Sequence, residues 1–299
     1  MTGVTVPLSR LVSDWDLAPV PLALAGCALM LFWQAFVRLR RRGRRDHASL
    51  GRAVLFVAGV ALATLAVISP LDTAGDEYLL SAHMLQHLLL GDAAPALLVL
   101  AVRGPLAFFL LPAPVLRPLA RLGPLRALLS FLLRPSVTFA VWVLAVGTWH
   151  VPAVYDYTLG HPLVHDLEHA TFVLAGLLVW TQLVDPTRHA RLSVGQRAGY
   201  AVALFAAGQV LSDVLIFSHS LYPAYAGQPD RLLGLSAAED QVRAGLLMMA
   251  EQIVTLGSCA ALLLWAHVEG LGTDEPSPGR LEAGVYPGST PTGSGSPTE

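Results

Sequence analysis

Seven runs of apolar residues decide what this chain can fold into. A helix that crosses the hydrocarbon core of a bilayer needs roughly 20 mostly apolar residues. Only 13% of the residues are charged, whereas soluble domains carry roughly 25%. We therefore expect an all-α fold, a polytopic transmembrane helix bundle with seven spans. The expected spans are about residues 17–37, 53–69, 79–102, 136–151, 163–184, 198–218 and 242–267.

The arginines indicate how these spans are oriented. The loop that follows the first run, Arg38–Arg45, is rich in arginine, whereas the loop before the third run holds Asp72, Asp76 and Glu77 and no arginine. Loops rich in basic residues stay on the cytoplasmic side of a membrane. We therefore expect the N-terminus outside and the C-terminus in the cytoplasm.

One stretch, Arg103–Pro135, is apolar but broken by prolines and dotted with arginines. We expect one or two short interfacial helices there, on the cytoplasmic side, rather than a further span. The chain then divides into an outer N-terminal segment (1–16), a seven-span domain (17–268) and a disordered cytoplasmic tail (269–299). The first segment lacks the basic start of a cleaved signal peptide, and the tail is rich in Gly, Ser, Pro and Thr.

Several function classes are disfavoured by the sequence. There is no CxxC or CxxCH motif, so neither a zinc ribbon nor attached haem c is indicated. Cys27 and Cys259 each lie inside an apolar run, where a small packing residue is the simplest interpretation. An arginine cluster between two spans faces the lipid surface, so the expected partner is the bilayer and not a nucleic acid.

Two pairs of histidines with the same spacing stand out within the expected spans. His83 and His87 lie in the first two turns of the third span, and His165 and His169 lie in the first two turns of the fifth. Residues four apart share one helical face. Imidazole is costly to place in hydrocarbon, so each pair indicates a ligand site. An i, i+4 pair can present both rings to one ion, and imidazole suits copper, zinc, iron or nickel.

The expected topology brings further side chains to the same membrane face. Spans that run outward end at His150 and His219, so these histidines converge with the two pairs, although a lone histidine at an interface is more often simply hydrated. Met84 and Met248 could add thioether contacts that favour Cu(I), but packing is the more common role of methionine. Asp213 and Glu251 could be ligands, proton carriers or partners of Arg243. Asp92 could pair with a neighbouring helix or contact water.

Three blocks of the sequence carry most of its histidines: Ser81–Leu90 (SAHMLQHLLL), Trp149–Asp156 (WHVPAVYD) and His161–His169 (HPLVHDLEH). Together with Leu177–Trp180, Leu221–Tyr225 and Glu239–Gln241, they resemble the multi-spanning CtaG family of caa3-type cytochrome c oxidase assembly factors. The resemblance covers about residues 50–268. It departs from the family pattern at Asp92, where an apolar residue is usual, and at Met248–Glu251, where a Trp-Val-Pro-Gly-like stretch is usual.

The resemblance implies a seven-span protein of the bacterial plasma membrane that takes part in oxidase maturation, with His83, His87, His150, His165 and His169 matching the family's histidines. We therefore expect a non-enzymatic factor that holds copper at the outer face and passes it to an apo-oxidase. Its partners would be oxidase subunits or other copper chaperones. The alternative is a haem-binding or quinone-linked redox protein, although one haem takes one axial ligand from each side and gains nothing from an i, i+4 pair.

The copper hypothesis makes a geometric prediction. If both pairs form one site, at least one ring of each pair must lie within about 6 Å of a ring of the other, because metal–imidazole bonds are about 2.0–2.1 Å. Gly91 and Gly176 lie on the faces that would meet. Small residues at such positions let membrane helices approach closely.

Overall fold

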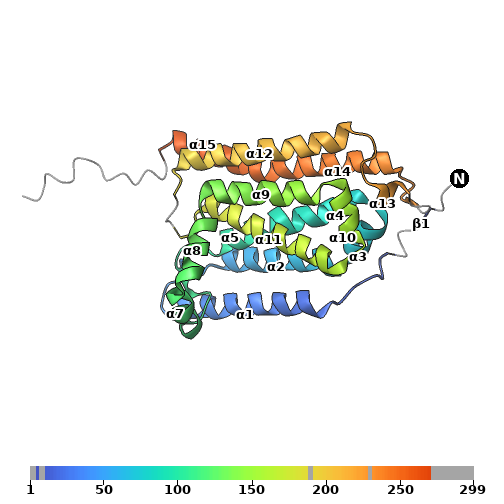
Figure 1. Ribbon diagram of the computed structural model, residues 1–299. Helices are drawn as coiled ribbons and strands as arrows, with labels where there is room; N and C mark the ends of the chain where they lie inside the picture. The colour runs from blue at the N-terminus through green and yellow to red at the C-terminus, as the bar shows by residue number, and fades with distance from the viewer. Residues whose placement is uncertain (1–4, 7–10, 188–190, 228–230, 271–299) are drawn as a thin grey trace, which may run out of the picture.

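The structure is a computed structural model that describes residues 5–6, 11–187, 191–227 and 231–270. It is a bundle of long helices that run side by side (Figure 1). Four of the long helices are α1 (Pro19–Arg41), α2 (Leu50–Ile68), α11 (Pro162–Val184) and α12 (Val194–Phe217). The tail after Gly270, which the sequence predicts to be disordered, lies outside the described residues.

Two further long helices each contain a π-helical turn. The first consists of α4 (Leu80–Leu88), η3 (Leu89–Ala93) and α5 (Ala94–Ala101). The second consists of α14 (Ala237–Gln252), η4 (Ile253–Gly257) and α15 (Ser258–Val268). Such turns insert an extra residue into the helix and are frequent at functional sites.

Six helices are long and apolar enough to cross a membrane. The remaining expected span, the fourth in chain order (136–151), corresponds to α9 (Pro135–Trp149), which has only 15 residues. It follows α8 (Gly123–Leu132) at an angle of 76°, and this bent pair makes a seventh span only if the two helices are counted together. The structure therefore confirms a multi-span helical fold with six spans, or up to seven.

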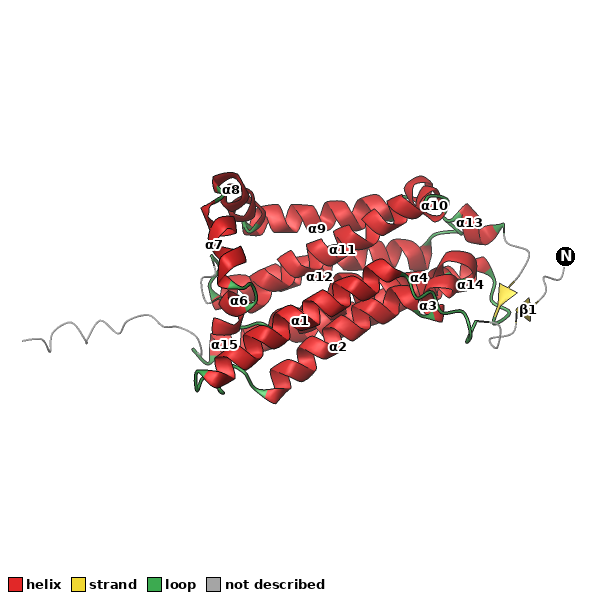
Figure 2. Ribbon diagram, turned by 90° about the horizontal axis from the view of Figure 1, so that it is seen from below, coloured by secondary structure: helices red, strands yellow, loops and turns green. Residues whose placement is uncertain are grey.

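The stretch Arg103–Pro135 contains three short helices, where the sequence predicted one or two. They are α6 (Pro105–Phe109), α7 (Ala113–Arg121) and α8, and they gather at one end of the bundle (Figure 2). Prolines at the first or second position of each helix explain why the stretch divides so often, because proline fits a first turn but ends the preceding helix.

The two ends of the bundle differ in chemistry. At the arginine end, α1 finishes at Arg41 and α6–α8 pack alongside. At the histidine end, α2 finishes at Ile68 and α11 begins at Pro162. The histidine end also carries the short elements α3 (Pro70–Thr73), η2 (Ala74–Tyr78), α10 (Pro152–Leu159) and α13 (Pro223–Ala226), and the paired strands β1 (Thr5–Val6) and β2 (Arg231–Leu232).

The helices that carry the expected site are packed in the middle of the bundle. In Figure 1, α1 and α2 lie along one side, α12, α14 and α15 lie along the other, and α4, α5, α9 and α11 lie between them. The inner apolar core joins α5, α11, α12 and η4 through side chains such as Val99, Leu183, Leu204 and Leu256. α1 packs on α2 through a separate cluster around Phe32 and Phe56, and its opposite side exposes Met30 and Trp33, as expected of a helix that faces lipid.

Candidate metal centre

Two helices bring four histidines together near the histidine end. His83 and His87 lie on α4, and His165 and His169 lie on α11. One ring nitrogen from each of the four falls within 4.8 Å of the others. The ring centres of His83 and His165 are 5.2 Å apart, and those of His87 and His169 are 5.5 Å apart. The prediction that a ring of each pair lies within about 6 Å of a ring of the other pair is therefore confirmed.

This four-histidine cluster is largely buried, and its buried ring nitrogens are short of hydrogen-bond partners. His83 is fully buried and His87 is 4% exposed. Both ring nitrogens of His83 and His87, and Nε2 of His165 and of His169, have no hydrogen-bond partner among the residues that the structure describes. A buried polar group without a partner costs about 1–3 kcal/mol, so the arrangement fits a group that the protein binds there.

Two acidic residues touch the cluster, and the sequence analysis did not include either among its candidates. Asp76 Oδ1, on η2, lies 3.3 Å from His83 Nδ1 and 3.6 Å from His165 Nε2. Glu168, on α11, is fully buried, and its Oε1 lies 3.5 Å from His87 Nε2. The signals in the sequence were the acidic loop before the third span and the Glu within His165-Asp-Leu-Glu-His169, but neither shows which way its side chain points.

Hydrogen bonds from three other elements hold α4 in place. Gln86, which lies between the two histidines of α4, donates from Nε2 to the carbonyl of Ala66 and to Asp72 Oδ1. Asp240, on α14, accepts hydrogen bonds from the backbone nitrogens of Leu80 and Ser81 and from the Ser81 hydroxyl. A carboxylate that binds the free N–H groups at a helix start also complements the helix dipole.

Buried tyrosines support the acidic side of the cluster. The hydroxyl of Tyr225 donates to the carbonyl of Gly75, immediately before Asp76, and the Tyr155 hydroxyl lies 2.8 Å from that of Tyr225. Burial raises the pKa of Tyr155 and of Tyr225 well above the ordinary value, so both phenols stay protonated. Gly75 itself is packed on α4, because a β-carbon there would lie 2.9 Å from the Cα of His83. These contacts fix η2, and with it Asp76, against His83.

The histidine end also holds an acidic side chain with altered protonation. Burial, and next the neighbouring charge of Asp76, raise the pKa of Asp72 to about 7. Two carboxyl groups close together disfavour simultaneous ionisation. This end of the bundle therefore presents both imidazoles and carboxylates, the donor types that bind divalent and transition metal ions.

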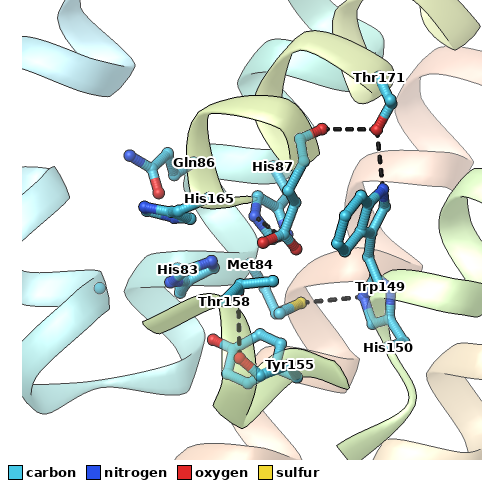
Figure 3. A network of polar contacts seen from close by, with 12 residues as sticks. His83, Met84, Gln86, His87, Trp149, His150, Tyr155, Thr158, His165 and Thr171 are labelled. Atoms are coloured by element: carbon cyan, nitrogen blue, oxygen red, sulfur yellow. Dashed lines mark hydrogen bonds and ion pairs between the residues drawn. The ribbon is translucent and has the colours of Figure 1, made fainter. Parts of the chain in front are cut away.

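His150 and Met84 lie beside the cluster as a pair. His150, at the end of α9, is 7% exposed, and its ring centre is 6.3 Å from that of His87. Its Nε2 lies 3.2 Å from Met84 Sδ (Figure 3). Its Nδ1 lies 2.7 Å from the carbonyl oxygen of Val146. His150 is thus adjacent to the four-histidine cluster but engages other partners.

The remaining candidates from the sequence lie elsewhere. His219 and Asp213 have exposed side chains, and neither joins the four-histidine cluster. Glu251 lies next to Asp92 deeper in the bundle, where it does not pair with Arg243, and Met248 packs near Met84. Asp92 accepts hydrogen bonds from Trp180 Nε1 and Thr255 Oγ1, so it does pair with neighbouring helices, one of the two alternatives considered from the sequence.

The geometry fits a metal ion bound through several imidazoles. Ligand atoms within 4.8 Å of one another need only side-chain rotations to share one ion at about 2.0–2.1 Å each. The carboxylate of Asp76 beside the imidazoles adds an oxygen donor, and its side chain is partly exposed at the histidine end.

Comparison with known proteins gave one match. Residues 30–269 match the family model described as cytochrome c oxidase caa3 assembly factor (Caa3_CtaG). This match covers most of the chain and confirms the resemblance found in its histidine blocks. No curated protein and no solved structure matches the chain.

Proposed function

Because the chain belongs to the family of cytochrome c oxidase caa3 assembly factors, we propose that it binds copper at the four-histidine cluster and supplies it to the oxidase. The observation that carries this proposal is the convergence of four imidazoles from α4 and α11, two of them buried and two partly buried, with buried ring nitrogens that form no hydrogen bond of good geometry. Imidazole suits copper, and copper is the cargo that maturation of a copper-containing oxidase requires.

The proposed role is delivery rather than catalysis. His83, His87, His165 and His169 would hold the ion, and Asp76 would be either a fifth donor or the carboxylate partner of His83 and His165. A site close to the histidine end would let a partner protein reach the ion. The partners would be oxidase subunits or other copper chaperones at the outer face of a bacterial plasma membrane.

A haem-binding redox role is less well supported by the geometry. The cavity beside the cluster has a volume of only about 60 Å³, whereas pockets for ligands of drug or cofactor size are roughly 300–1,000 Å³. Four imidazoles packed ring against ring also leave no flat slot between the two pairs.

The test is metal analysis of protein purified without a histidine tag. We expect copper to co-purify with the wild type, and we expect His87→Ala and His169→Ala each to lose the ion of the four-histidine cluster. The double change should add little, because both substitutions break one site. Since His219 is exposed and does not belong to the four-histidine cluster, His219→Ala is the matched control and should retain copper.

Two results would contradict the proposal. The first is a reducible Soret band in the visible spectrum of the purified protein, which would indicate haem. The second is additive, partial loss of the copper bound by the four-histidine cluster in the two histidine variants, which would indicate that the two histidine pairs bind separate ions. Supply to the oxidase is tested separately, by measuring the copper content of a caa3-type oxidase in cells that carry wild type or His87→Ala.

A further inference from the structure

A cavity of about 60 Å³ extends from the four-histidine cluster into the interior of the bundle. His87, His150 and Met84 line it on the side of the cluster, and Asp92, Glu251 and Gln252 line it deeper in. The cavity is larger than the roughly 10–15 Å³ that a water molecule requires. It therefore has room for a small ion between a group of nitrogen and sulfur atoms and a group of oxygen atoms.

On the side of the cavity next to the four-histidine cluster, two atoms with lone pairs face each other. Because a carbonyl can only accept, the short contact of 2.7 Å between His150 Nδ1 and the Val146 carbonyl places the ring proton on Nδ1. In the neutral ring, Nε2 then carries a lone pair, and it points at Met84 Sδ, 3.2 Å away, which has no proton to donate. Two such donors, 3.2 Å apart, can share one ion at ordinary metal–ligand distances of about 2.0–2.3 Å.

In the deeper part of the cavity, the carboxyl groups of Asp92 and Glu251 lie side by side, with no cationic side chain of the described residues paired to them. Asp92, within η3, accepts hydrogen bonds from Trp180 and from Thr255, which lies within η4. Neither Asp92 nor Glu251 forms an ion pair in the described part of the chain, and the buried oxygens of Glu251 have no hydrogen-bond partner of good geometry there. Acidic side chains deep in a membrane protein are costly and mark an ion or proton site.

Other buried groups on the cavity wall also lack partners. Gln252 is 5% exposed, yet its Oε1 has no hydrogen-bond partner among the described residues, and Nδ1 of His87, which is 4% exposed, likewise has none. These groups line the same space as the carboxyl pair. Several unsatisfied groups around one cavity indicate a bound species rather than a packing defect.

We propose that this cavity is a second copper site, selective for Cu(I), with Met84 Sδ and His150 Nε2 as ligands and the Asp92–Glu251 pair as its counter-charge. Thioether and imidazole ligands select Cu(I) over harder ions. A single negative charge on the carboxyl pair offsets the single positive charge of Cu(I). The site rests on the proposed function, because copper handling is its premise, but its ligands differ from those of the four-histidine cluster.

The test is an anaerobic titration of the purified full-length protein with Cu(I) against a chromophoric chelator. We expect two Cu(I) ions per wild-type chain. Met84→Leu, which conserves the volume of a buried side chain, should lower the number to one. Asp92→Asn should weaken the second ion at least tenfold and leave the first unchanged. His165 does not line the cavity, so His165→Ala should remove only the ion of the four-histidine cluster. Met30 is 71% exposed and does not line the cavity, so Met30→Leu is the control for Met84→Leu and should bind two ions.

X-ray absorption at the copper edge gives an independent readout of the ligands. Sulfur scattering at about 2.3 Å should be present in the wild type and in His165→Ala and absent in Met84→Leu. One ion per wild-type chain without sulfur scattering would overturn the second site and leave the proposed function standing. Loss of both ions in a folded Met84→Leu variant would also overturn it, because the cavity and the cluster would then be one site. If neither the wild type nor any variant bound copper, the proposed function itself would be refuted.

Discussion

The backbones of Gly91 and Gly176 are in direct contact, since a β-carbon built on Gly176 would lie 2.0 Å from the carbonyl oxygen of Gly91. Gly91 lies on η3, four residues after His87, and Gly176 lies on α11, seven residues after His169. The contact therefore sets the distance between the two helices that carry the four histidines. Small residues at such crossings permit the close packing that membrane helices require.

Gly176→Ala is expected to push α11 away from η3. The added methyl group would meet backbone, which cannot rotate aside, so we expect a loss of stability of about 1–3 kcal/mol and weaker copper retention. Thermal unfolding in detergent and copper analysis measure the two effects. Gly199 has no atom within 4 Å of an added β-carbon, so Gly199→Ala is the control and should behave as wild type. If Gly176→Ala kept the stability and the copper retention of the wild type, the contact between the two glycines would not be required for the four-histidine cluster.

The main features of the site could be predicted from the sequence because they depend on helical periodicity. An i, i+4 spacing places His83 beside His87 in any helix, and the alternation of span directions brings His165 and His169 to the same end. Helical periodicity also places Gly91 and Gly176 on the same faces as the histidines, so their role in the close approach of the two helices could be predicted as well. Local spacing and the alternation of span directions are therefore sufficient to predict the cluster.

What the sequence did not predict depends on packing between distant segments. Asp76 reaches the cluster only because η2 folds back onto α4, and Asp92 meets Thr255 only because two π-helical turns lie opposite each other. His219 and Asp213 lie at the expected end of their helix, but their side chains are exposed. The helices that pack against α12 decide which of its side chains are buried, and the sequence pattern of α12 alone does not identify those helices.

Asp72 should make the stability of the protein depend on pH. Its pKa is raised from 3.8 to about 7 by burial and by Asp76. Between about pH 4 and pH 7 the folded protein therefore holds a proton that the unfolded chain releases, so this contribution to stability is lost as the pH rises through that range. In Asp72→Asn we expect a flatter dependence of the unfolding temperature on pH, by a few degrees across the range.

The control for this experiment is Asp213→Asn, which removes an equal charge from an exposed position. It should keep the pH dependence of the wild type. Thermal unfolding in detergent at several pH values between 4 and 7.5 provides the measurement. Equal slopes for Asp72→Asn and wild type would show that Asp72 titrates near its ordinary pKa.

The orientation of the bundle is tested by labelling single cysteines in intact cells. In a background of Cys27→Ser and Cys259→Ser, we expect Ser220→Cys, at the histidine end, to react with a membrane-impermeant maleimide. Arg45→Cys, at the arginine end, should react only after the cells are permeabilised. Both positions are exposed, so accessibility does not differ between them in the isolated protein. Labelling of Arg45→Cys in intact cells would reverse the orientation inferred from the arginines.

Asp76 and Glu77 provide a matched pair for testing how the acidic loop acts on the cluster. Asp76 Oδ1 touches His83 Nδ1 and His165 Nε2, whereas the neighbouring Glu77 is exposed. A carboxylate partner orients a metal-binding imidazole, and its loss typically weakens metal binding about 10–100-fold. We expect a loss of that size in Asp76→Asn and less than about a twofold change in Glu77→Gln, measured by chelator competition. Both substitutions remove one negative charge, so an equal loss in both, diminished by added salt, would instead indicate attraction of the ion by the charge of the loop.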